Sequence, residues 1–301
     1  MHQKGVVSVN FTIGFGNNLF QYCYARLLAE NNDMGLHHKG IPEFNIPPAA
    51  PPIDSKLRTY IITDDTALQG LEHRLTNNNV VVNGYFEDYR LYEKDLERIR
   101  SWFPRVPQAN TTDLILHLRL QNRLVQQTHH KNHILADGYK RGMEKFKFDR
   151  LHIITDAKKW EPHTEEDIEE IRDEITVGPN PAHSSPWVKM DQSLYYINTL
   201  IEGFADMNPI VHIPDAPVIK GTGGLRSNHM QDFDFIRSFD QIMIFNSTFS
   251  WWAALLSDAK HVGTWLPWKP NKGPRNKNLG QTAYPGWFSW GSTEDLYWEK
   301  K

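Results

Sequence analysis

The sequence predicts an α/β protein built on parallel sheets, and three observations support this fold class. Short apolar runs typical of strands alternate with segments whose apolar residues recur at helical spacing. The chain has 301 residues, a length that suggests two domains or one large α/β domain. Hydrophobic residues make up 40% of the chain, which is enough for a real core and argues against wholesale disorder.

The N-terminal part opens with a strand–loop–helix unit. Val6 to Val9 is an apolar run, and Gly14 to Asn18 follows it as a glycine-containing loop. Residues 19–30 carry apolar side chains at helical spacing, which predicts a helix. A second strand is expected at 80–82 and a second helix at 92–103.

The segment from Pro104 to Thr112 holds two prolines and several polar residues, and it is the best candidate for a domain boundary. We therefore expect two domains, residues 1–110 and residues 111–301. In the second, strands are expected at 114–120, 151–155, 210–213, 242–245 and 261–265. Helices are expected between them at 137–146, 162–175, 193–204, 233–239 and 247–256.

The composition excludes several classes of partner. The net charge of −3, with mixed signs throughout, gives no electrostatic footprint for nucleic acid or for an anionic membrane. The single cysteine, Cys23, allows no intramolecular disulfide and fits a reducing compartment. No run approaches 18 apolar residues, so we expect neither a transmembrane segment nor a visible secretion signal.

Seven of the ten tryptophans lie in the C-terminal third of the chain. Indole rings stack well on the apolar faces of sugars, but tryptophans also fill protein cores. Core packing is the favoured interpretation for any one of them.

The loop with Gly14 and Gly16 is the first candidate site. Glycines let the backbone approach a ligand, and the following helix N-terminus offers free N–H groups to an anion. Leu19 stands where a third glycine would complete a dinucleotide-binding fingerprint. On spacing alone, a plain tight turn is the favoured interpretation.

The second candidate follows the strand at 114–120. Alternation places His117, Arg119 and Gln121 on one face, and polar groups at the carboxyl end of a parallel strand face the ligand crevice. Arginine suits bidentate contact with phosphate. A polar strand end that merely meets solvent is an equal alternative.

The third candidate is the helix start at Ser247, Thr248 and Ser250. Asn246 or Ser247 suits the N-cap. Capping accounts for one such residue, whereas three hydroxyls could also supply donors to a phosphate. Two further clusters, His129 to His133 and Gly221 to Gly224, lack the partners of a metal site or phosphate loop, and surface loops are expected there.

These segments together resemble the GDP-fucose-dependent α-1,2-fucosyltransferases, a family 11-like group of glycosyltransferases. The order of the matches is that of the family, and they span nearly the whole chain. Residues 14–22, GFGNNLFQY, are similar to its opening GxGNQMFQY, and residues 246–254, NSTFSWWAA, are similar to its NSSFSWWxAW; both motifs are specific. Weaker matches are Asn83 to Phe86, His117 to Arg119, Ile154 to Asp156 and Trp265 to Trp268.

The resemblance implies a GT-B architecture, in which two Rossmann-like domains face each other across a cleft. Residues 1–110 would hold the acceptor and residues 111–301 the nucleotide-sugar donor. The activity implied is metal-independent, inverting transfer of fucose from GDP-fucose to a hydroxyl of a galactoside glycan, without a cofactor. We expect a cytoplasmic location, with or without peripheral attachment to a membrane where glycans are assembled.

The same resemblance implies roles for individual residues. Arg119 would bind the donor diphosphate, and His117 would help to hold the nucleotide. Asp156 would contact the donor region, and Asp234 would read guanine. The three hydroxyl residues at the 247–256 helix would lie near the phosphates. Asn17 would lie at the cleft beside the sugar and, with Arg119, would be a catalytic residue. Gly14 and Gly16 would help to bind the donor.

Several departures from the family pattern leave the exact donor open. The second arginine of its HxRRGD motif is Leu120 here, its aspartate is Asn122, and the second aspartate of FSDD is Ala157. Arg123 either replaces the missing charge or has no role. The alternatives are a transferase for another GDP-sugar and an inactive sugar- or nucleotide-binding relative.

Two further points concern carboxylates. Asp232 and Asp234 spell the DxD signature of a metal-dependent glycosyltransferase class, but a predicted helix is the wrong setting and no metal is expected. Glu87 and Asp88 are weak candidates for the general base that should assist the acceptor hydroxyl, and surface charge is the favoured interpretation for both.

Overall fold

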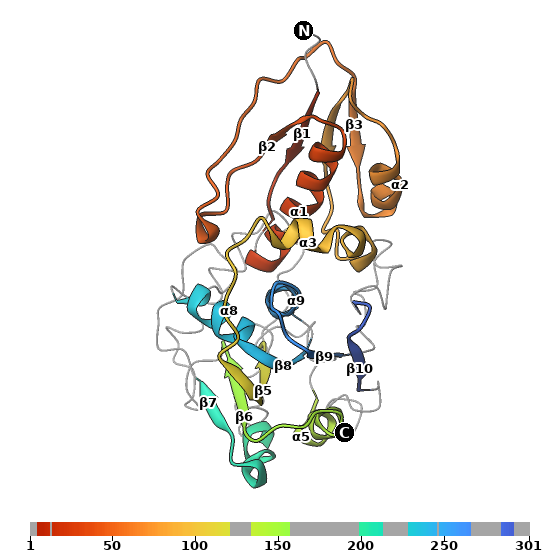
Figure 1. Ribbon diagram of the computed structural model, residues 1–301. Coiled ribbons are helices and arrows are strands. Elements are labelled where there is room, and N and C mark those ends of the chain that lie inside the picture. The colour runs from red at the N-terminus through yellow and green to blue at the C-terminus, as the bar shows by residue number, and fades with distance from the viewer. Residues whose placement is uncertain are drawn as a thin grey trace, which may run out of the picture. The chain divides into compact units, whose positions relative to one another are not determined.

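The computed structural model describes residues 5–12, 14–120, 134–156, 199–212, 228–245, 247–265 and 284–291 (Figure 1). They form two compact units, each described here by itself. Of the described residues, unit 1 contains those up to Arg105 together with 284 and 285, and unit 2 contains the rest from Val106 onward. Among these residues, no helix is both long and apolar enough to cross a membrane.

Unit 1 is built on a four-stranded parallel sheet with the strand order β2-β1-β4-β3. Its strands are β1 (Val6–Val9), β2 (Gly35–His37), β3 (Thr59–Ile62) and β4 (Asn79–Val82). The two central strands are nearly continuous apolar runs, as expected for parallel strands buried between layers. The sequence analysis found β1 and β4 but not the two edge strands, which are short or largely exposed.

Helix α1 (Phe15–Asn31) packs along β1, and most of its side chains are buried, including the lone Cys23 at 0% exposure. The helix begins at Phe15, so the expected loop forms its first turn instead. Only Gly14 lies outside, with a φ of 104° that favours glycine. The glycine therefore serves to turn the chain from β1 into α1.

Shorter helices complete unit 1. They are α2 (Ala67–Glu72), α3 (Leu96–Arg100) and the 3-10 helices Pro42–Phe44, Asp64–Thr66, Tyr89–Leu91 and Glu93–Asp95. The expected helix at 92–103 is thus α-helical only in its middle. Asp88 accepts bonds from the backbone N–H of Arg90 and from its guanidinium, which holds the chain in the 3-10 turn before α3.

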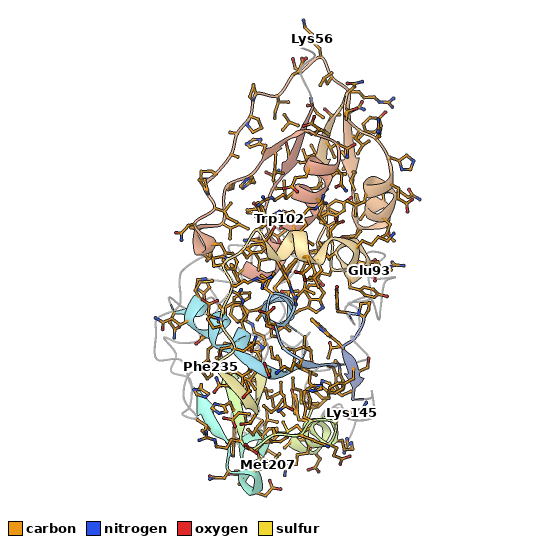
Figure 2. The ribbon with its side chains drawn as sticks, viewed as in Figure 1. Lys56, Glu93, Trp102, Lys145, Met207 and Phe235 are labelled. Carbon is orange, nitrogen blue, oxygen red and sulfur yellow. The ribbon has the colours of Figure 1, made fainter. Side chains whose placement is uncertain are left out.

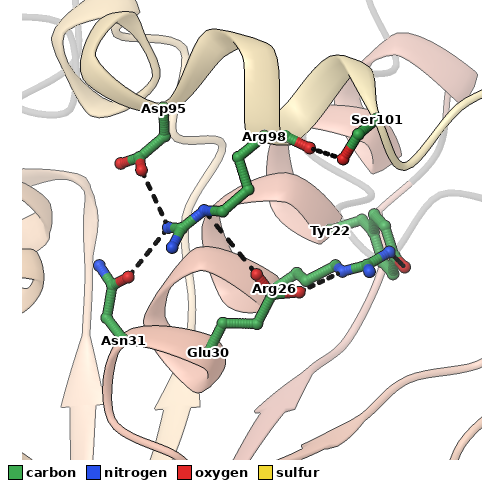
Figure 3. Close-up of polar contacts among 7 residues, drawn as sticks. All are labelled: Tyr22, Arg26, Glu30, Asn31, Asp95, Arg98 and Ser101. Atoms are coloured by element: carbon green, nitrogen blue, oxygen red, sulfur yellow. Dashed lines mark hydrogen bonds and ion pairs between the residues drawn. The ribbon is translucent and has the colours of Figure 1, made fainter.

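A polar network braces α3 against α1 (Figure 3). Arg98 donates to Asn31 Oδ1 at 2.9 Å and pairs with Asp95 at 3.1 Å. Arg26 donates to Glu30 Oε1 at 2.7 Å and lies over the Trp102 ring, 4.3 Å from its centroid. Because these groups are partly exposed, the network aligns the helices while adding little stability.

Unit 2 is built on a six-stranded parallel sheet with the strand order β10-β9-β8-β5-β6-β7. Its strands are β5 (Asn110–Leu118), β6 (Leu151–Thr155), β7 (Ile210–His212), β8 (Phe239–Ile244), β9 (His261–Trp265) and β10 (Phe288–Trp290). Counted within the unit, this is the 3-2-1-4-5-6 order typical of a doubly wound α/β sheet. The order reverses between β5 and β8, which places a topological switch point at their carboxyl ends.

The described part of unit 2 includes the helices α5 (Ala136–Met143), α8 (His229–Arg237) and α9 (Thr248–Leu255), a helical segment at 199–202 and a 3-10 helix at Ala205–Met207. Alternation along the strands separates two faces of the sheet. One face, with Leu116, Leu118 and Leu120 of β5 and its extension, packs in the core that includes α5. The opposite face carries His117, whose ring lies 5.7 Å from that of Phe249 on α9.

Tryptophans fill the interior of unit 2. Trp251, Trp252, Trp265 and Trp290 are each no more than 3% exposed, and the rings of Trp265 and Trp290 meet edge to face 5.2 Å apart. For these four residues, the core interpretation is confirmed.

The α/β class with parallel sheets is confirmed, and most of the expected elements occur. The strand at 261–265 has the expected bounds, whereas the helix expected at 233–239 runs from His229 to Arg237 and is followed at once by β8. The helix expected at 162–175, the histidine cluster at 129–133 and the glycines at 221–224 lie outside the described residues.

Candidate functional site

The switch point of unit 2 gathers several of the residues singled out by sequence. β5 ends at Leu118 and is followed by Arg119, β6 ends at Thr155 and is followed by Asp156, and β8 leads through Phe245 to Ser247. Because all three strands are parallel, their carboxyl ends lie at one edge of the sheet. Ligands of doubly wound sheets bind at such an edge.

An ion pair links two of these strand ends. Arg119 Nη1 lies 2.5 Å from Asp156 Oδ2, and the other carboxylate oxygen accepts a bond from the backbone N–H of Leu120 at 2.7 Å. The Arg119 and Asp156 side chains are 18% and 12% exposed, so water reaches both. Asp156 thus fixes the backbone after β5 and orients the guanidinium at the same time.

His117 lies deeper than Arg119 on the same face of the sheet. Only 5% of the residue is exposed, and its ring packs at an angle of 32° to that of Phe249, in the first turn of α9. The side chain therefore connects β5 to the start of α9. A role in holding a nucleotide stays a prediction.

The N-terminus of α9 follows β8 directly. Ser247 occupies the N-cap position, with φ −147° and ψ 121°, but its hydroxyl makes no capping hydrogen bond. The first N–H groups of a helix lack partners within the helix and attract anions. Asn246, the other expected cap, lies outside the described residues.

The three hydroxyl residues of this segment differ in their settings. Ser250 is fully buried and donates to the Ser247 carbonyl at 3.2 Å, within the first turn of its own helix. Ser247 is 3% exposed, and Thr248 is half-buried. The Ser250 hydroxyl is engaged in a hydrogen bond within the helix. Ser247 and Thr248 are therefore the better candidates to contact a ligand.

Asp234 lies on α8, with a side chain that is 46% exposed. Its Oδ1 accepts a bond at 2.9 Å from Arg237, which is 2% exposed and also donates to the carbonyl of Leu256 at the C-terminal end of α9. A buried cation near the last carbonyls of a helix is stabilising. Asp234 is therefore tied to the end of α9 remote from Ser247, and its reading of guanine stays a prediction.

Gly14, Gly16 and Asn17 belong to unit 1, at the carboxyl end of β1. Gly16 is buried in the first turn of α1, and Asn17 is partly buried beside Gly14. Gly14 turns the chain into the helix, as described above. The expected place of Asn17 beside the sugar stays a prediction.

Sequence reasoning missed Gln21 and Asp64, both of which organise the strand ends of unit 1. Gln21, 2% exposed, accepts from the Thr12 backbone N–H at 3.0 Å and donates to the Gly84 carbonyl at 2.8 Å. The Asp64 carboxylate accepts from the backbone N–H groups of Tyr85, at 2.9 Å, and Phe86, at 2.6 Å. The only available signal for Gln21 was its place in the first motif.

A second unexpected cluster crosses the face of unit 2 that carries His117. His152 Nε2 lies 3.1 Å from Asp113 Oδ2, and His152 Nδ1 lies 3.0 Å from His212 Nε2. The pKa of His212 is lowered by burial first and then by the neighbouring His152. Among the described residues, no group of three or more His, Cys, Asp or Glu side chains could hold a metal ion.

The two carboxylates weighed as a general base have different settings. Asp88 is 7% exposed and forms a fork-like pair with the Arg90 guanidinium, with Oδ2 to Nη2 at 2.6 Å. The carboxylate is therefore used to hold the turn after β4. Glu87, half-buried next to it, stays a candidate from sequence alone.

Comparison with known proteins gives a distant structural likeness. The sequence matches no protein-family description and no curated protein. A solved mutant of Arabidopsis thaliana FUT1 in complex with GDP is similar in structure at 10% identity and a TM-score of 0.41. The match covers 92% of this chain and 73% of that chain. A likeness at this level is too distant to assign an activity, so the function is inferred below from this chain's own residues.

Proposed function

We propose that the protein is an inverting glycosyltransferase that moves fucose from GDP-fucose to a hydroxyl of a galactoside glycan, forming an α-1,2 linkage. The observation that carries the proposal is the grouping of Arg119, Asp156 and the N-terminus of α9 at the switch point of a doubly wound sheet. The motifs at 14–22 and 246–254 support the choice of donor. Neither the linkage nor the acceptor rests on geometry.

Diphosphate recognition follows from the charges at this edge. Arg119 offers a planar fork of N–H donors, which matches phosphate oxygens. The start of α9 adds backbone donors and the positive end of the helix dipole. The two features follow β5 and β8, the strands that flank the switch point, so a diphosphate bound between them would meet both.

The reaction is a displacement at the anomeric carbon of the donor sugar. A hydroxyl oxygen of the acceptor forms the new bond to this carbon from one face while the bond to the β-phosphate oxygen breaks on the other. The electron pair of that bond stays with GDP, and the hydroxyl proton passes to a base. Negative charge therefore grows on the diphosphate, where preorganised donors lower the barrier.

Asp156 acts in this proposal as a positioning residue. Its ion pair holds the guanidinium of Arg119 at the strand end, and its bond to Leu120 N–H holds the backbone there. A diphosphate would compete for Arg119, yet arginine has five N–H donors and can serve both groups. No metal is included, because Arg119 and the helix N-terminus can supply the positive potential.

Calorimetry with a panel of nucleotides and nucleotide sugars tests the proposal directly. Wild type should bind GDP and GDP-fucose with or without a chelator, and Arg119→Ala should lose both. Arg150→Ala is the matched control, since Arg150 is 67% exposed and faces Asp113 instead. Preference for a UDP donor, or equal binding by wild type and Arg119→Ala, would refute the assignment.

One observation favours the alternative of a binding protein without turnover. Leu120 stands where the resembling family has a second arginine, and it is 2% exposed in the core of unit 2. The described end of β5 thus carries one arginine where the family has two. Release of GDP from GDP-fucose in the presence of galactoside acceptors separates the two functions, because a binding protein would release none. Screening other GDP-sugars in the same assay covers a transferase with a different donor.

A further inference from the structure

The β3 edge of unit 1 is open to solvent in the described structure. β3 pairs with β4 on one side and with no other described strand. Thr59, Tyr60 and Ile61 are all exposed, Ile61 to 65% and Tyr60 to 37%. Exposed apolar side chains on an edge strand are a ready surface for pairing with another strand.

Two residues of β3 direct their backbone N–H and C=O groups away from β4, toward the open edge. Arg58 and Ile62 accept bonds through their carbonyls from Asn79 and Asn83, at the two ends of β4. Since successive residues of a strand direct their backbone groups to opposite sides, Thr59 and Ile61 present theirs to the outer edge. Each of these residues therefore brings one N–H and one C=O to the open side.

Charges flank β3 with opposite signs. Lys56 and Arg58, both exposed, precede the strand, and Lys56 extends into solvent at its amino end (Figure 2). Asp64 and the exposed Asp65 follow the strand. Edges that natural proteins protect against pairing carry charges that repel an incoming copy. Here an antiparallel copy would place its acidic end beside the basic end of the first.

We propose that a second copy of this chain pairs with β3 in antiparallel orientation, about a two-fold axis near Tyr60. Thr59 of each copy would exchange backbone hydrogen bonds with Ile61 of the other, which joins two four-stranded sheets into one. The interface is isologous, since one surface meets itself. It is independent of the proposed transferase activity.

The choice of a second copy follows from self-complementarity. A two-fold axis places each basic end opposite an acidic end, so both charge contacts are attractive. A parallel copy would bring like charges together and is disfavoured. The Arg58 guanidinium lies 4.9 Å from the centroid of the Tyr60 ring, so it extends the same surface beside the axis.

Sedimentation velocity of the full chain over a wide range of concentration tests the dimer. Wild type should show a concentration-dependent dimer. Ile61→Pro removes an outward N–H without removing a bond to β4, and it should raise the dissociation constant by at least about tenfold. Ile53→Ser is the control, because Ile53 is a comparably exposed apolar residue outside β3, at 49%. Thermal melting monitors the folding of each variant.

A charge exchange gives the sharper test. Lys56→Glu with Arg58→Glu makes both ends of β3 acidic, and Asp65→Lys weakens the acidic end while leaving Asp64 to bind Tyr85 and Phe86. Each variant alone should dimerise less than wild type. An equimolar mixture of the two should form a heterodimer, because the acidic end of one variant meets the basic end of the other. High salt should weaken this heterodimer. A monomeric wild type, unchanged dimerisation of the variants, or a mixture no better than its components would overturn the proposal.

Discussion

The central strands of the two sheets end in contrasting ways. In unit 1, the chain after β1 and the chain after β4 are joined by the neutral amide of Gln21, which is 2% exposed. In unit 2, the end of β5 carries Arg119 paired with Asp156, and both side chains reach water. A satisfied buried amide favours stability, whereas accessible charges at a switch point favour ligand binding. We therefore expect the strand ends to stabilise the fold in unit 1 and to bind the ligand in unit 2.

The largest expected effect tests the charged end. Arg119→Ala should lower kcat/KM for transfer by about 10²–10³, or roughly 3–4 kcal/mol, because one preorganised donor to the leaving diphosphate is lost. Steady-state kinetics with saturating acceptor measures it. Arg119→Lys, which keeps the charge but loses the fork, should recover part of the rate. Near-normal transfer by Arg119→Ala would show that the charged end of β5 does not bind the leaving diphosphate. The two strand ends would then not differ in the way proposed.

Gln21→Ala should lower the stability of the protein and leave its affinity for GDP unchanged. It removes the partner of the Thr12 N–H and of the Gly84 carbonyl, both partly buried, at a cost of about 1 kcal/mol for each lost bond. Urea denaturation should show this loss of unfolding free energy, while calorimetry shows unchanged affinity for GDP. The exposed Gln69 of α2 provides the control, since Gln69→Ala should change neither quantity. Loss of GDP affinity in Gln21→Ala without loss of stability would contradict the comparison.

Two substitutions at Asp156 separate its two contacts. Asp156→Asn keeps an acceptor for Leu120 N–H, whereas Asp156→Ala loses both that bond and the partner of Arg119. The alanine variant should bind GDP about tenfold more weakly, a change of roughly 1.4 kcal/mol, and the asparagine variant should be less affected. Equal affinities in the two variants and wild type would show that Asp156 does not position Arg119.

Acid should destabilise both units through one buried histidine, His38, and one partly buried histidine, His212. Burial is the largest cause that lowers the pKa of His38 in unit 1 and of His212 in unit 2. Since the unfolded histidines bind protons more readily, stability should fall as pH drops below about 6.5, by at most about 1.4 kcal/mol per pH unit for each residue. The decline should level off below the folded pKa values. Urea titrations across this range should show a shallower slope for His212→Gln; an unchanged slope would exclude His212 as a source.

The smallest effect is expected for Ser250→Ala. Its hydroxyl bonds within the first turn of α9, so its removal should cost about 0.5–1.5 kcal/mol of stability and leave GDP affinity within about twofold. Thr248→Ala, nearer the proposed ligand, should weaken GDP binding more. Calorimetry on the two variants decides this, and the reverse order would place the ligand against the Ser250 side of the helix.

The fold followed from sequence where periodicity is strong. The strands β6 and β9 have the expected bounds, and the apolar second half of β8, from Ile242, was also expected as a strand. The edge strands β2, β3 and β10 were missed: β2 and β10 have only three residues each, and β3 is a four-residue strand whose first three residues are exposed. The first turn of α1 was taken for a loop, since two glycines outweighed the helical context that packing provides.

For the candidate site, the sequence indicated which residues lie at the strand ends but not how they pair. Alternation along β5 assigned Arg119 to the ligand side, yet nothing in the sequence indicated that Asp156 would hold it. Gln21 and the Asp113–His152–His212 chain join residues far apart in the sequence, and only the folded register brings them together. Asp234 illustrates the converse case, because its bond to Arg237 is a local i,i+3 contact that sequence inspection could have found.

The alternation of side chains along β5 limits how the sequence of this chain can evolve. Leu116 and Leu118 contribute to the core, and Leu120 after the strand does the same, whereas His117 and the following Arg119 lie on the opposite side. Inserting or deleting one residue within the strand would exchange these two sets, burying a guanidinium and exposing a leucine. If the proposed function holds, substitutions at its end can alter the choice of donor, whereas a one-residue change in its length would disrupt the core. New specificities in such a protein should arise by replacement within β5 and by growth of the connecting segments.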